Sequence, residues 1–343
     1  RHCRYFHRQI TQHTLLYTEM VTTGALLHGD VPRHLRFDVS EHPLALQLGG
    51  SEPDDLARCA RLAETWGYDE VNLNCGCPSE RVQRGAFGAC LMTEPDLVAQ
   101  CIKAMKDAVD IPISVKHRLG LDQMDASTSV EDYQFALDFM LAVADAGASQ
   151  VTIHARNAVL KGLSPKENRT KPALHYEVAK QLRTDAKKSY PNLQVLLNGG
   201  LETNEQIAAH WHDFDGFMVG RAAYHFPAML LGWDDLLQSD GSAAGYLFSE
   251  TEWHRIQIGL VQQSKAWFDH CQDHQKPFYL GAITRHIMGL AHGRAGSRRW
   301  RQRLSDHRAL AQVKSKEAIE EFFFEASLEL GDWAAFDLNA QSA

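Results

Sequence analysis

Several features that would narrow the class of this 343-residue chain are missing from its sequence. No apolar run approaches the roughly 20 residues that a membrane-spanning helix needs, and no signal peptide precedes the first strand pattern. The seven cysteines form an odd set without the spacing of a disulfide framework, which favours a protein of the reducing cytoplasm. No pair of cysteine and histidine clusters has zinc-like spacing, so we expect no metal site.

Positive charge is also in deficit, because 35 Lys and Arg face 43 Asp and Glu and give a formal net charge of -8. Taken alone, that balance argues against a nucleic-acid partner. In residues 276–308, however, positive side chains greatly outnumber negative ones, which predicts a polyanion-binding surface. The alternative is a solvated helix face whose charges pair with acids elsewhere. Against a single acid, Asp306, this basic stretch carries Lys276, Arg285, Arg294, Arg298, Arg299, Arg301, Arg303 and Arg308.

Seven short β-strand patterns alternate with amphipathic stretches of helix length. This alternation is typical of α/β proteins and predicts a (β/α)8 TIM barrel, whose active site lies at the C-terminal ends of the strands. The strand patterns cover residues 14–21, 43–50, 70–77, 112–120, 150–156, 194–200 and 216–222.

A closed barrel needs eight strands, and residues 4–11 resemble a helix. The chain also opens Arg1-His2-Cys3 without a methionine. We therefore expect the first strand of the barrel, with its loop, to precede Arg1.

The strand pattern stops near residue 232, which predicts a barrel domain over residues 1–233 and a small all-helical domain over residues 234–343. Turns such as 239–245 and 293–297 separate the helical segments of the second part. These segments cover residues 252–272, 277–290, 298–321 and 322–330.

Glycines end the last two strand patterns. Asn198-Gly199-Gly200 closes one, and Gly220-Arg221 closes the next. Loops after the last two strands of such barrels often bind phosphate, because bare backbone N–H groups approach an anion closely and an arginine adds a forked donor. The alternative is that these glycines only make turns.

Three polar side chains near other strand ends fit the same ligand. Lys116 lies near the end of an apolar strand, where an inward ammonium needs an anion; an outward, snorkelling lysine is the alternative. His154 and Gln47 can donate hydrogen bonds. A phosphate grip, a cation and amide donors together suit flavin mononucleotide (FMN).

Cys77 lies between Gly76 and Pro78 at the predicted barrel rim. A free thiol of ordinary pKa, about 8.5, is mostly protonated at neutral pH and can act as a general acid. Strand alternation puts Cys75 and Cys77 on one face, so a C-x-C metal pair is the rival reading.

The longest irregular segment of the barrel, residues 157–171, carries four positive side chains: Lys161, Lys166, Arg169 and Lys171. Loops of this length inside compact domains are usually functional.

At residues 70–89 the sequence resembles the tRNA-dihydrouridine synthases. That family's signature is present as Val71-Asn72-Leu73-Asn74-Cys75-Gly76-Cys77-Pro78, with Val82 and Gly88-Ala89 at the family's offsets. The segments VKHRLG, HAR, NGG and VGRA also occur where the family has them. FGACLM (87–92) and GLSPKENR (162–169) resemble its A subfamily, which is associated with U20 and U20a.

The resemblance implies an enzyme with FMN as cofactor and NADPH as reductant. It implies that reduced FMN delivers hydride to C6 of a flipped D-loop uridine in tRNA, while Cys77 protonates C5. Implied FMN contacts are Gln47, Lys116, His154, Asn198, Gly199, Gly200, Gly220 and Arg221. Implied tRNA contacts are Asn74, Lys166, Glu167 and Arg169, with Arg285 of the basic stretch as the favoured helical-domain contact.

Two other functions compete with this one. An FMN barrel acting on a free pyrimidine would share the chemistry, but it needs neither the cationic loop nor the basic stretch. An RNA-binding module with the barrel as a scaffold would bind no flavin. We expect a cytoplasmic monomer that binds no membrane.

Overall fold

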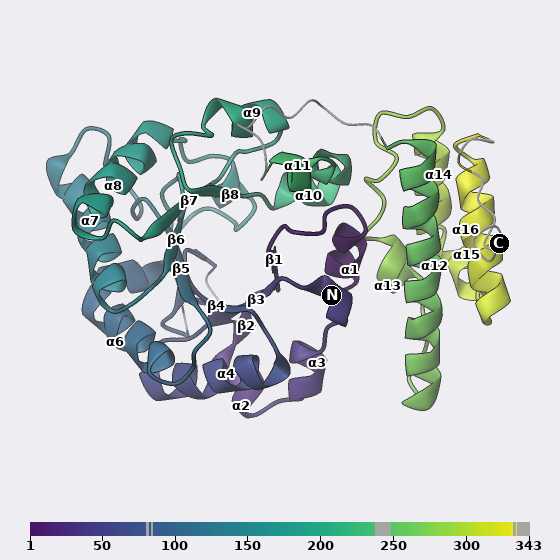
Figure 1. Cartoon of the computed structure of the whole chain (residues 1–343), viewed down its shortest axis with the longest axis horizontal. Coiled ribbons are helices and arrows are strands. Elements are labelled where there is room, and N and C mark those ends of the chain that lie inside the picture. The colour runs from purple at the N-terminus through teal and green to yellow at the C-terminus, as the bar shows by residue number, and fades with distance from the viewer. Residues whose placement is uncertain (80–81, 84, 237–247, 332–333, 335–343) are drawn as a thin grey trace. The chain divides into compact units, whose positions relative to one another are not determined.

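The structure is a computed structural model that describes residues 1–79, 82–83, 85–236, 248–331 and 334 (Figure 1). Contacts divide the chain into two compact units. We call Leu15–Glu202 with Gln206–Val219 the sheet unit, and Arg1–Thr14, Thr203–Glu205 and Gly220–Ala343 the helical unit. The assignment of residues 1–233 to catalysis and 234–343 to tRNA binding stays a prediction.

A single parallel sheet forms the centre of the sheet unit. Its strands pair in the order β1-β3-β4-β5-β6-β7-β8, and β2 also pairs with β3. This succession of parallel strands confirms the (β/α)8 fold class. The strands are β1 (Leu16–Tyr17), β2 (Val21–Thr22), β3 (Leu44–Gly49), β4 (Glu70–Cys75), β5 (Ile113–Arg118), β6 (Gln150–His154), β7 (Gln194–Asn198) and β8 (Gly216–Met218).

The first predicted strand, residues 14–21, is interrupted in the structure. It forms the two short strands β1 and β2, and the hydroxyl of Thr18 between them accepts a hydrogen bond from the backbone N–H of Gln47. A side chain therefore replaces part of the backbone ladder. The expected further strand before Arg1 stays an expectation.

Helices line the outer side of the curved sheet, as Figure 1 shows for α4, α6, α7 and α8. Strand residues that alternate with the polar ones, such as Leu46, Leu73 and Val115, are fully buried in the apolar core of this unit. The helices, 3-10 turns included, are α2 (Thr23–Leu27), α3 (Val31–Leu35), η1 (Val39–Glu41), α4 (Pro53–Trp66), η2 (Gly88–Thr93), α6 (Pro95–Lys106), α7 (Val130–Asp145), η3 (Glu167–Arg169), α8 (Tyr176–Ser189) and α9 (Asn204–Ala209).

The helical unit has its own core. The rings of Trp253 and Trp300 meet edge to face with centroids 5.4 Å apart, and both are fully buried together with Phe323. Its helices are α1 (His2–Arg8), α10 (Arg221–His225), η4 (Pro227–Leu230), α11 (Trp233–Leu236), α12 (Glu250–Asp273), α13 (Gly281–Thr284), α14 (Ser297–Ser305), α15 (His307–Gln312) and α16 (Lys316–Leu328).

Helix boundaries in this unit differ from the predicted ones. The segment 298–321 is divided because Asp306 caps α15 and Ser315 caps α16, each accepting backbone hydrogen bonds at a new N-terminus. No break occurs between residues 321 and 322, since α16 runs through them, and 277–290 contains only the short α13. The predicted turn at 239–245 lies outside the described residues.

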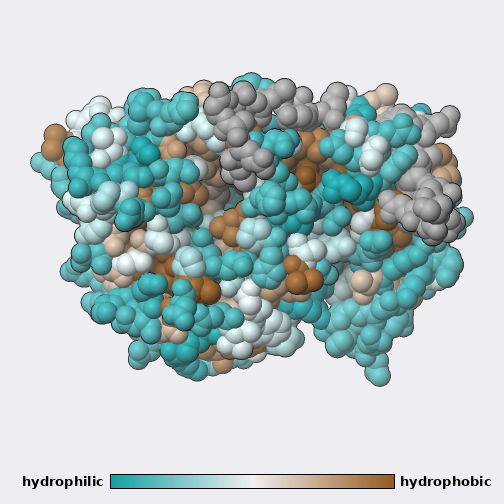
Figure 2. Space-filling view, viewed as in Figure 1, coloured by the Kyte–Doolittle hydropathy of each residue, from teal (hydrophilic) through white to brown (hydrophobic). Residues whose placement is uncertain are grey.

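Figure 2 shows one face of the molecule, on which hydrophobic residues form small separate groups among hydrophilic ones. Among the described residues, no helix combines the length and apolar character needed to cross a membrane.

Candidate active site

Polar side chains fill the inner face of the sheet towards the C-terminal ends of its strands. The register aligns Asn74 of β4 with Lys116 of β5 and with Thr152 of β6. Two residues further along, Arg118, His154 and Asn198 are aligned across β5, β6 and β7. Because side chains two apart share a face, the polar residues lie in successive layers inside the sheet.

The turn that carries Cys77 is held through its backbone. Asn74 lies beneath it, and the side-chain Oδ1 of Asn74 accepts hydrogen bonds from the N–H groups of Gly76 at 3.1 Å and Cys77 at 3.0 Å. The backbone carbonyls of the turn are also bound by side chains. Arg118 Nε donates to the carbonyl of Gly76 at 3.2 Å, and Gln83 Nε2 donates to the carbonyl of Pro78 at 2.8 Å. The half-buried Cys77 side chain therefore projects from a turn whose orientation is fixed.

The returning chain closes over this turn at Gly88. Its φ of +80° is in the left-handed region, and a Cβ there would lie 2.6 Å from the carbonyl oxygen of Cys77. The next residue, Ala89, donates its N–H to that same oxygen at 3.0 Å. Glycine is thus required for the close approach.

The two cysteines of the C-x-C pattern do not form a ligand pair. β4 ends at Cys75, so strand alternation does not continue to Cys77, and the expectation that they share a face was wrong on this point. Cys75 is fully buried in the apolar core, where loss of water raises the pKa of its thiol. Within the described residues, no three His, Cys, Asp or Glu side chains are grouped to hold a metal ion.

A continuous line of hydrogen bonds runs along the inner face of β4 below the Cys77 turn. Asn74 Nδ2 donates to Gln47 Oε1, Gln47 Nε2 donates to Asn72 Oδ1, and Asn72 Nδ2 donates to Ser114 Oγ, each at 2.8 Å. Ser114 Oγ then donates to a carboxylate oxygen of Glu70 at 2.5 Å. We call these five side chains the internal polar chain: Asn74, Gln47, Asn72, Ser114 and Glu70.

Lys116 is the least compensated charge of this face. Burial, followed by the nearby positive charges of Arg118 and Arg169, lowers the pKa of its ammonium to about 7, against a smaller opposing effect of Cys77. Among the described residues no acid pairs with it, and the buried hydroxyl of Thr152 beside it in the register has no hydrogen bond. Clustered cations with an orphaned hydroxyl suit an anionic, hydrogen-bonding ligand.

The end of β7 packs tightly against the end of β6. Gly199 has a φ of +104°, and a Cβ there would lie 2.4 Å from Cδ2 of His154. Gly200 has a φ of +70°, and its Cβ would lie 2.9 Å from the hydroxyl of Tyr176, which donates to the carbonyl of Gly199 at 2.6 Å. The structure thus places His154 beside the Asn198-Gly199-Gly200 turn, while the binding of a common ligand by these residues stays a prediction. There is no room for a side chain at Gly199 or Gly200.

Gly220 and Arg221 belong to the helical unit, where they begin α10 and are exposed. A Cβ on Gly220 would meet nothing within 4 Å, so no steric demand explains this glycine. Their role in phosphate binding stays a prediction.

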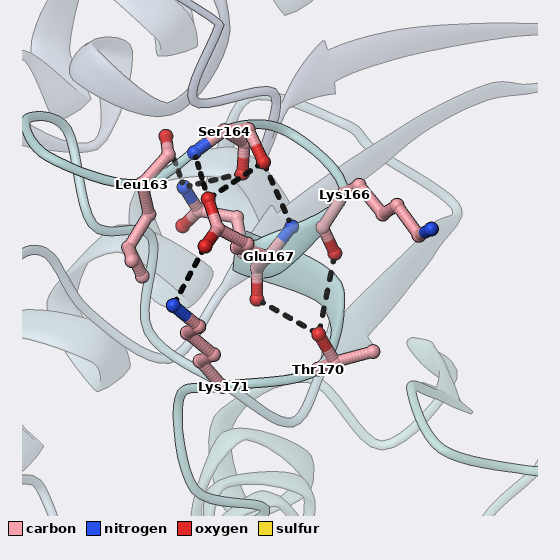
Figure 3. A network of polar contacts seen from close by, with 7 residues as sticks. Leu163, Ser164, Lys166, Glu167, Thr170 and Lys171 are labelled. Carbon is pink, nitrogen blue, oxygen red and sulfur yellow. Dashed lines mark hydrogen bonds and ion pairs between the residues drawn. The ribbon is translucent and has the colours of Figure 1, made fainter.

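The cationic loop, residues 157–171, is folded around its own side chains. In Figure 3, one carboxylate oxygen of Glu167 accepts from the N–H and the hydroxyl of Ser164, and the other accepts from Lys171 at 2.6 Å. The hydrogen bond from Lys171, followed by those from Ser164, lowers the pKa of Glu167 to about 2. Lys166 and Arg169 are exposed.

Two residues that are predicted to contact tRNA, Glu167 and Asn74, make hydrogen bonds within the protein. The carboxylate of Glu167 shapes the loop, and the amide of Asn74 supports the Cys77 turn from inside. For both residues, a direct contact with tRNA stays a prediction, as it does for Lys166 and Arg169.

Two residues that the sequence analysis did not select join the loop to the turn. Arg118 is buried and donates to the carbonyls of Asn157 at 3.1 Å and Asn168 at 3.0 Å as well as to Gly76. Gln83 donates to the carbonyl of Leu160 at 2.9 Å as well as to Pro78. Arg118 could have been found from its position two residues after Lys116 in the same strand; Gln83 gave no such signal.

The basic stretch of the helical unit is partly neutralised. Arg299 pairs with Glu329 at 3.0 Å, Arg303 pairs with Glu325, and Arg294 donates to a backbone carbonyl. Arg285 is exposed, and its Nε donates to the ring of His286 at 3.2 Å. The other side chains of the stretch are exposed: Lys276, Arg298, Arg301 and Arg308.

Comparison with known proteins shows the family of this chain. The family model described as "Dihydrouridine synthase (Dus)" matches residues 1–327, and the chain belongs to this family of enzymes. It is 53% identical over 306 residues to the tRNA-dihydrouridine(20/20a) synthase of Pseudomonas aeruginosa, covering 89% of this chain and 85% of that protein. Proteins of the same name from Vibrio parahaemolyticus and Synechocystis sp. are each 47% identical, covering 90% and 91% of this chain and 87% of each relative.

Proposed function

We propose that this chain is a flavin-dependent tRNA-dihydrouridine synthase that reduces the C5–C6 bond of a D-loop uridine at position 20 or 20a. The observation that carries the proposal is the fixed turn of Cys77 beside the cationic residue Lys116, at the C-terminal ends of β4 and β5. The printed names of the relatives support tRNA as the substrate and positions 20 and 20a as the targets.

The inner face of the sheet unit suits FMN as the cofactor and NADPH as its reductant. Lys116 would bind the anionic part of the flavin ring, Gln47 would offer the second hydrogen of its amide, and His154 with the turn at Gly199 would hold the remaining polar groups. When bound, FMN would supply the hydride for C6 of the uracil.

The protein's own residues then perform the proton chemistry. Cys77 holds a proton on its thiol and gives it to C5 of the uracil. Asn74 keeps the turn of Cys77 in place during this transfer. A uridine inside a stacked tRNA cannot reach the sheet, so the base must leave its stack first. Exposed cations of the loop, Lys166 and Arg169, would contact the phosphate backbone.

The test is reoxidation of the reduced flavin under anaerobic conditions. We expect an unmodified tRNA transcript to reoxidise it and to gain dihydrouridine, whereas a transcript with cytidines at positions 20 and 20a should not. Equal reoxidation by free uracil or uridine would favour an enzyme of free pyrimidines. A purified protein without flavin absorbance would favour an RNA-binding module. We further propose that the enzyme acts in the cytoplasm as a monomer.

A further inference from the structure

The internal polar chain connects the two ends of β4. Glu70 is the first residue of this strand, and Cys77 lies two residues beyond its last one. Neither Glu70 nor Ser114 takes part in the chemistry proposed above, yet both are at least nine-tenths buried inside the sheet. A carboxylate placed there costs free energy unless its hydrogen bonds are used.

Hydrogen-bond donation runs in a single direction along the internal polar chain, and the groups at its two ends determine that direction. At the Cys77 end, two backbone N–H groups can only donate, so Asn74 must turn its oxygen towards them. At the other end, the same carboxylate oxygen of Glu70 accepts from Ser114 at 2.5 Å and from the hydroxyl of Tyr17 at 2.8 Å. Donation therefore runs from the turn to Glu70 through every link.

The three side-chain amides between these ends can hold only one orientation each. Rotating the amide of Gln47 or Asn74 by half a turn would bring two acceptors together at one contact and two donors together at another. Rotating that of Asn72 would bring two NH2 groups together at Gln47 and would require Ser114 to donate to Asn72 instead of Glu70. Asn72 and Ser114 are fully buried, so water does not replace a lost partner. The orientation of one amide thus fixes that of the next.

We propose that Glu70 is a positioning residue for the turn of Cys77 and acts from the opposite end of β4 through the internal polar chain. Its oxygen is the final acceptor that keeps Ser114 donating, so that Asn74 presents its oxygen to the turn. The inference rests on the proposed function, in which the thiol must meet one atom of the substrate.

Hydrogen exchange of the Gly76 and Cys77 amides tests the proposal directly. It is followed by NMR on the full-length protein labelled with 15N-glycine and 15N-cysteine. In Ser114→Ala and Glu70→Leu we expect both amides to exchange about fivefold to tenfold faster, the change produced by losing one hydrogen bond of ordinary strength. Glu70→Gln keeps an oxygen at the acceptor position, so its exchange should stay within about twofold of the parent protein's.

The amides of Cys101 in α6 and of Gly147, which donates to the carbonyl of Ala144 at 3.0 Å, serve as controls within the same spectra. Unchanged exchange at Gly76 and Cys77 in Ser114→Ala would overturn the proposal, and this variant decides the matter if Glu70→Leu does not fold. Two further results would also overturn it. One is equally faster exchange at the control amides; the other is exchange at Gly76 and Cys77 that accelerates as much in Glu70→Gln as in Glu70→Leu.

A second measurement separates this inference from the proposed function. In Ser114→Ala, dihydrouridine formation should fall about tenfold, while reduction of the flavin by NADPH stays within about twofold of the parent rate. Should the parent protein form no dihydrouridine, the proposed function fails, and the exchange rates still decide whether Glu70 holds the turn. Equal loss in both half-reactions would overturn the positioning role.

Discussion

At the scale of single residues, the unusual feature is a lysine with which no acid of the described residues forms an ion pair. Lys116 points into the sheet beside Arg118, and its pKa is lowered to about 7 by burial first and by Arg118 and Arg169 next. An ammonium in such surroundings is unfavourable in the ligand-free protein and favourable once an anion is bound. If Lys116 binds an anion, as proposed, it contributes to ligand binding at a cost to the stability of the ligand-free protein.

Replacing Lys116 should show this directly in the ligand-free protein. Below pH 7 the folded and unfolded states both carry the charge; between pH 7 and the unfolded value near 10.5 only the unfolded state does. The unfolding free energy of the parent should therefore rise with pH across that interval. The unfolding free energy of Lys116→Met should exceed that of the parent at pH 6 by at least about 1.4 kcal/mol, the equivalent of one pKa unit. At pH 9 the difference should be smaller.

Urea unfolding at the two pH values measures this difference, with Lys106→Met on the exposed side of α6 as the matched control. Lys116→Met should also lose its bound flavin. A stability gain of equal size at both pH values, or none, would mean that Lys116 is not a buried charge.

The sequence predicted which strand positions face inward better than what each side chain does there. Lys116 and His154 could be selected because period-2 alternation and the end of a strand define their places. The amide of Asn74 could not be assigned, because its three hydrogen bonds depend on Gln47 of another strand and on the turn at Gly76. Arg118 could have been selected by the same alternation, since it lies two residues after Lys116, but its carbonyl partners in the Cys77 turn and in the loop 157–171 could not.

At the scale of the elements, the end of β7 shows how little space the candidate site leaves. Gly199→Ala would place a Cβ 2.4 Å from the ring of His154 on a residue whose φ is +104°. We expect a loss of at least about 1–2 kcal/mol from the backbone conformation alone, together with displacement of His154. Gly24→Ala in α2 is the control, since its Cβ would meet nothing within 4 Å.

Thermal unfolding of both variants measures the effect, and flavin content reports on His154. If Gly199→Ala unfolds at the same temperature as Gly24→Ala and retains flavin, the tight contact between the two strand ends does not constrain the site.

The helical unit shows where sequence periodicity stops being sufficient. An apolar pattern over 298–321 does not reveal that Asp306 and Ser315 each cap a new helix. Both residue types are favoured at N-caps, but the period of the apolar residues does not say which of them will accept the backbone hydrogen bonds of a new helix. The strand order from β3 to β8 could be predicted because each of these strands pairs with its successor in the sequence, whereas β1 and β2 both pair with β3. Cap positions depend on single side-chain contacts and could not.

At the scale of the whole molecule, a net charge of -8 has to be reconciled with tRNA as the proposed substrate. Part of the basic stretch is paired with Glu325 of α16 and with Glu329 at the C-terminal cap of that helix, which supports the alternative reading for those arginines. Arg298 and Arg301 form no ion pair among the described residues and are exposed, although Arg301 Nε donates to the carbonyl of Ser297 at 3.4 Å. Affinity for tRNA should therefore depend on individual arginines.

Two variants distinguish these groups. The double variant Arg298→Ala with Arg301→Ala should weaken tRNA binding. The slope of the logarithm of the binding constant against the logarithm of the salt concentration should become shallower by about 1–2, because each phosphate contact contributes about 0.7–0.9. Arg303→Ala, which loses its pairing with Glu325, should change the unfolding free energy by about 1 kcal/mol or less and leave that slope unchanged. Binding titrations at several salt concentrations measure it. Identical slopes for all three proteins would place the RNA surface elsewhere.

The most direct measurement of the central claim is single-turnover formation of dihydrouridine by Cys77→Ala, starting from reduced flavin and unmodified tRNA. Cys75→Ala is its matched control, because that thiol lies in the apolar core. We expect Cys77→Ala to bind flavin, to oxidise NADPH and to form dihydrouridine at least about 100-fold more slowly than the parent, as the loss of a general acid predicts. Dihydrouridine formation by Cys77→Ala at the rate of Cys75→Ala would contradict the account.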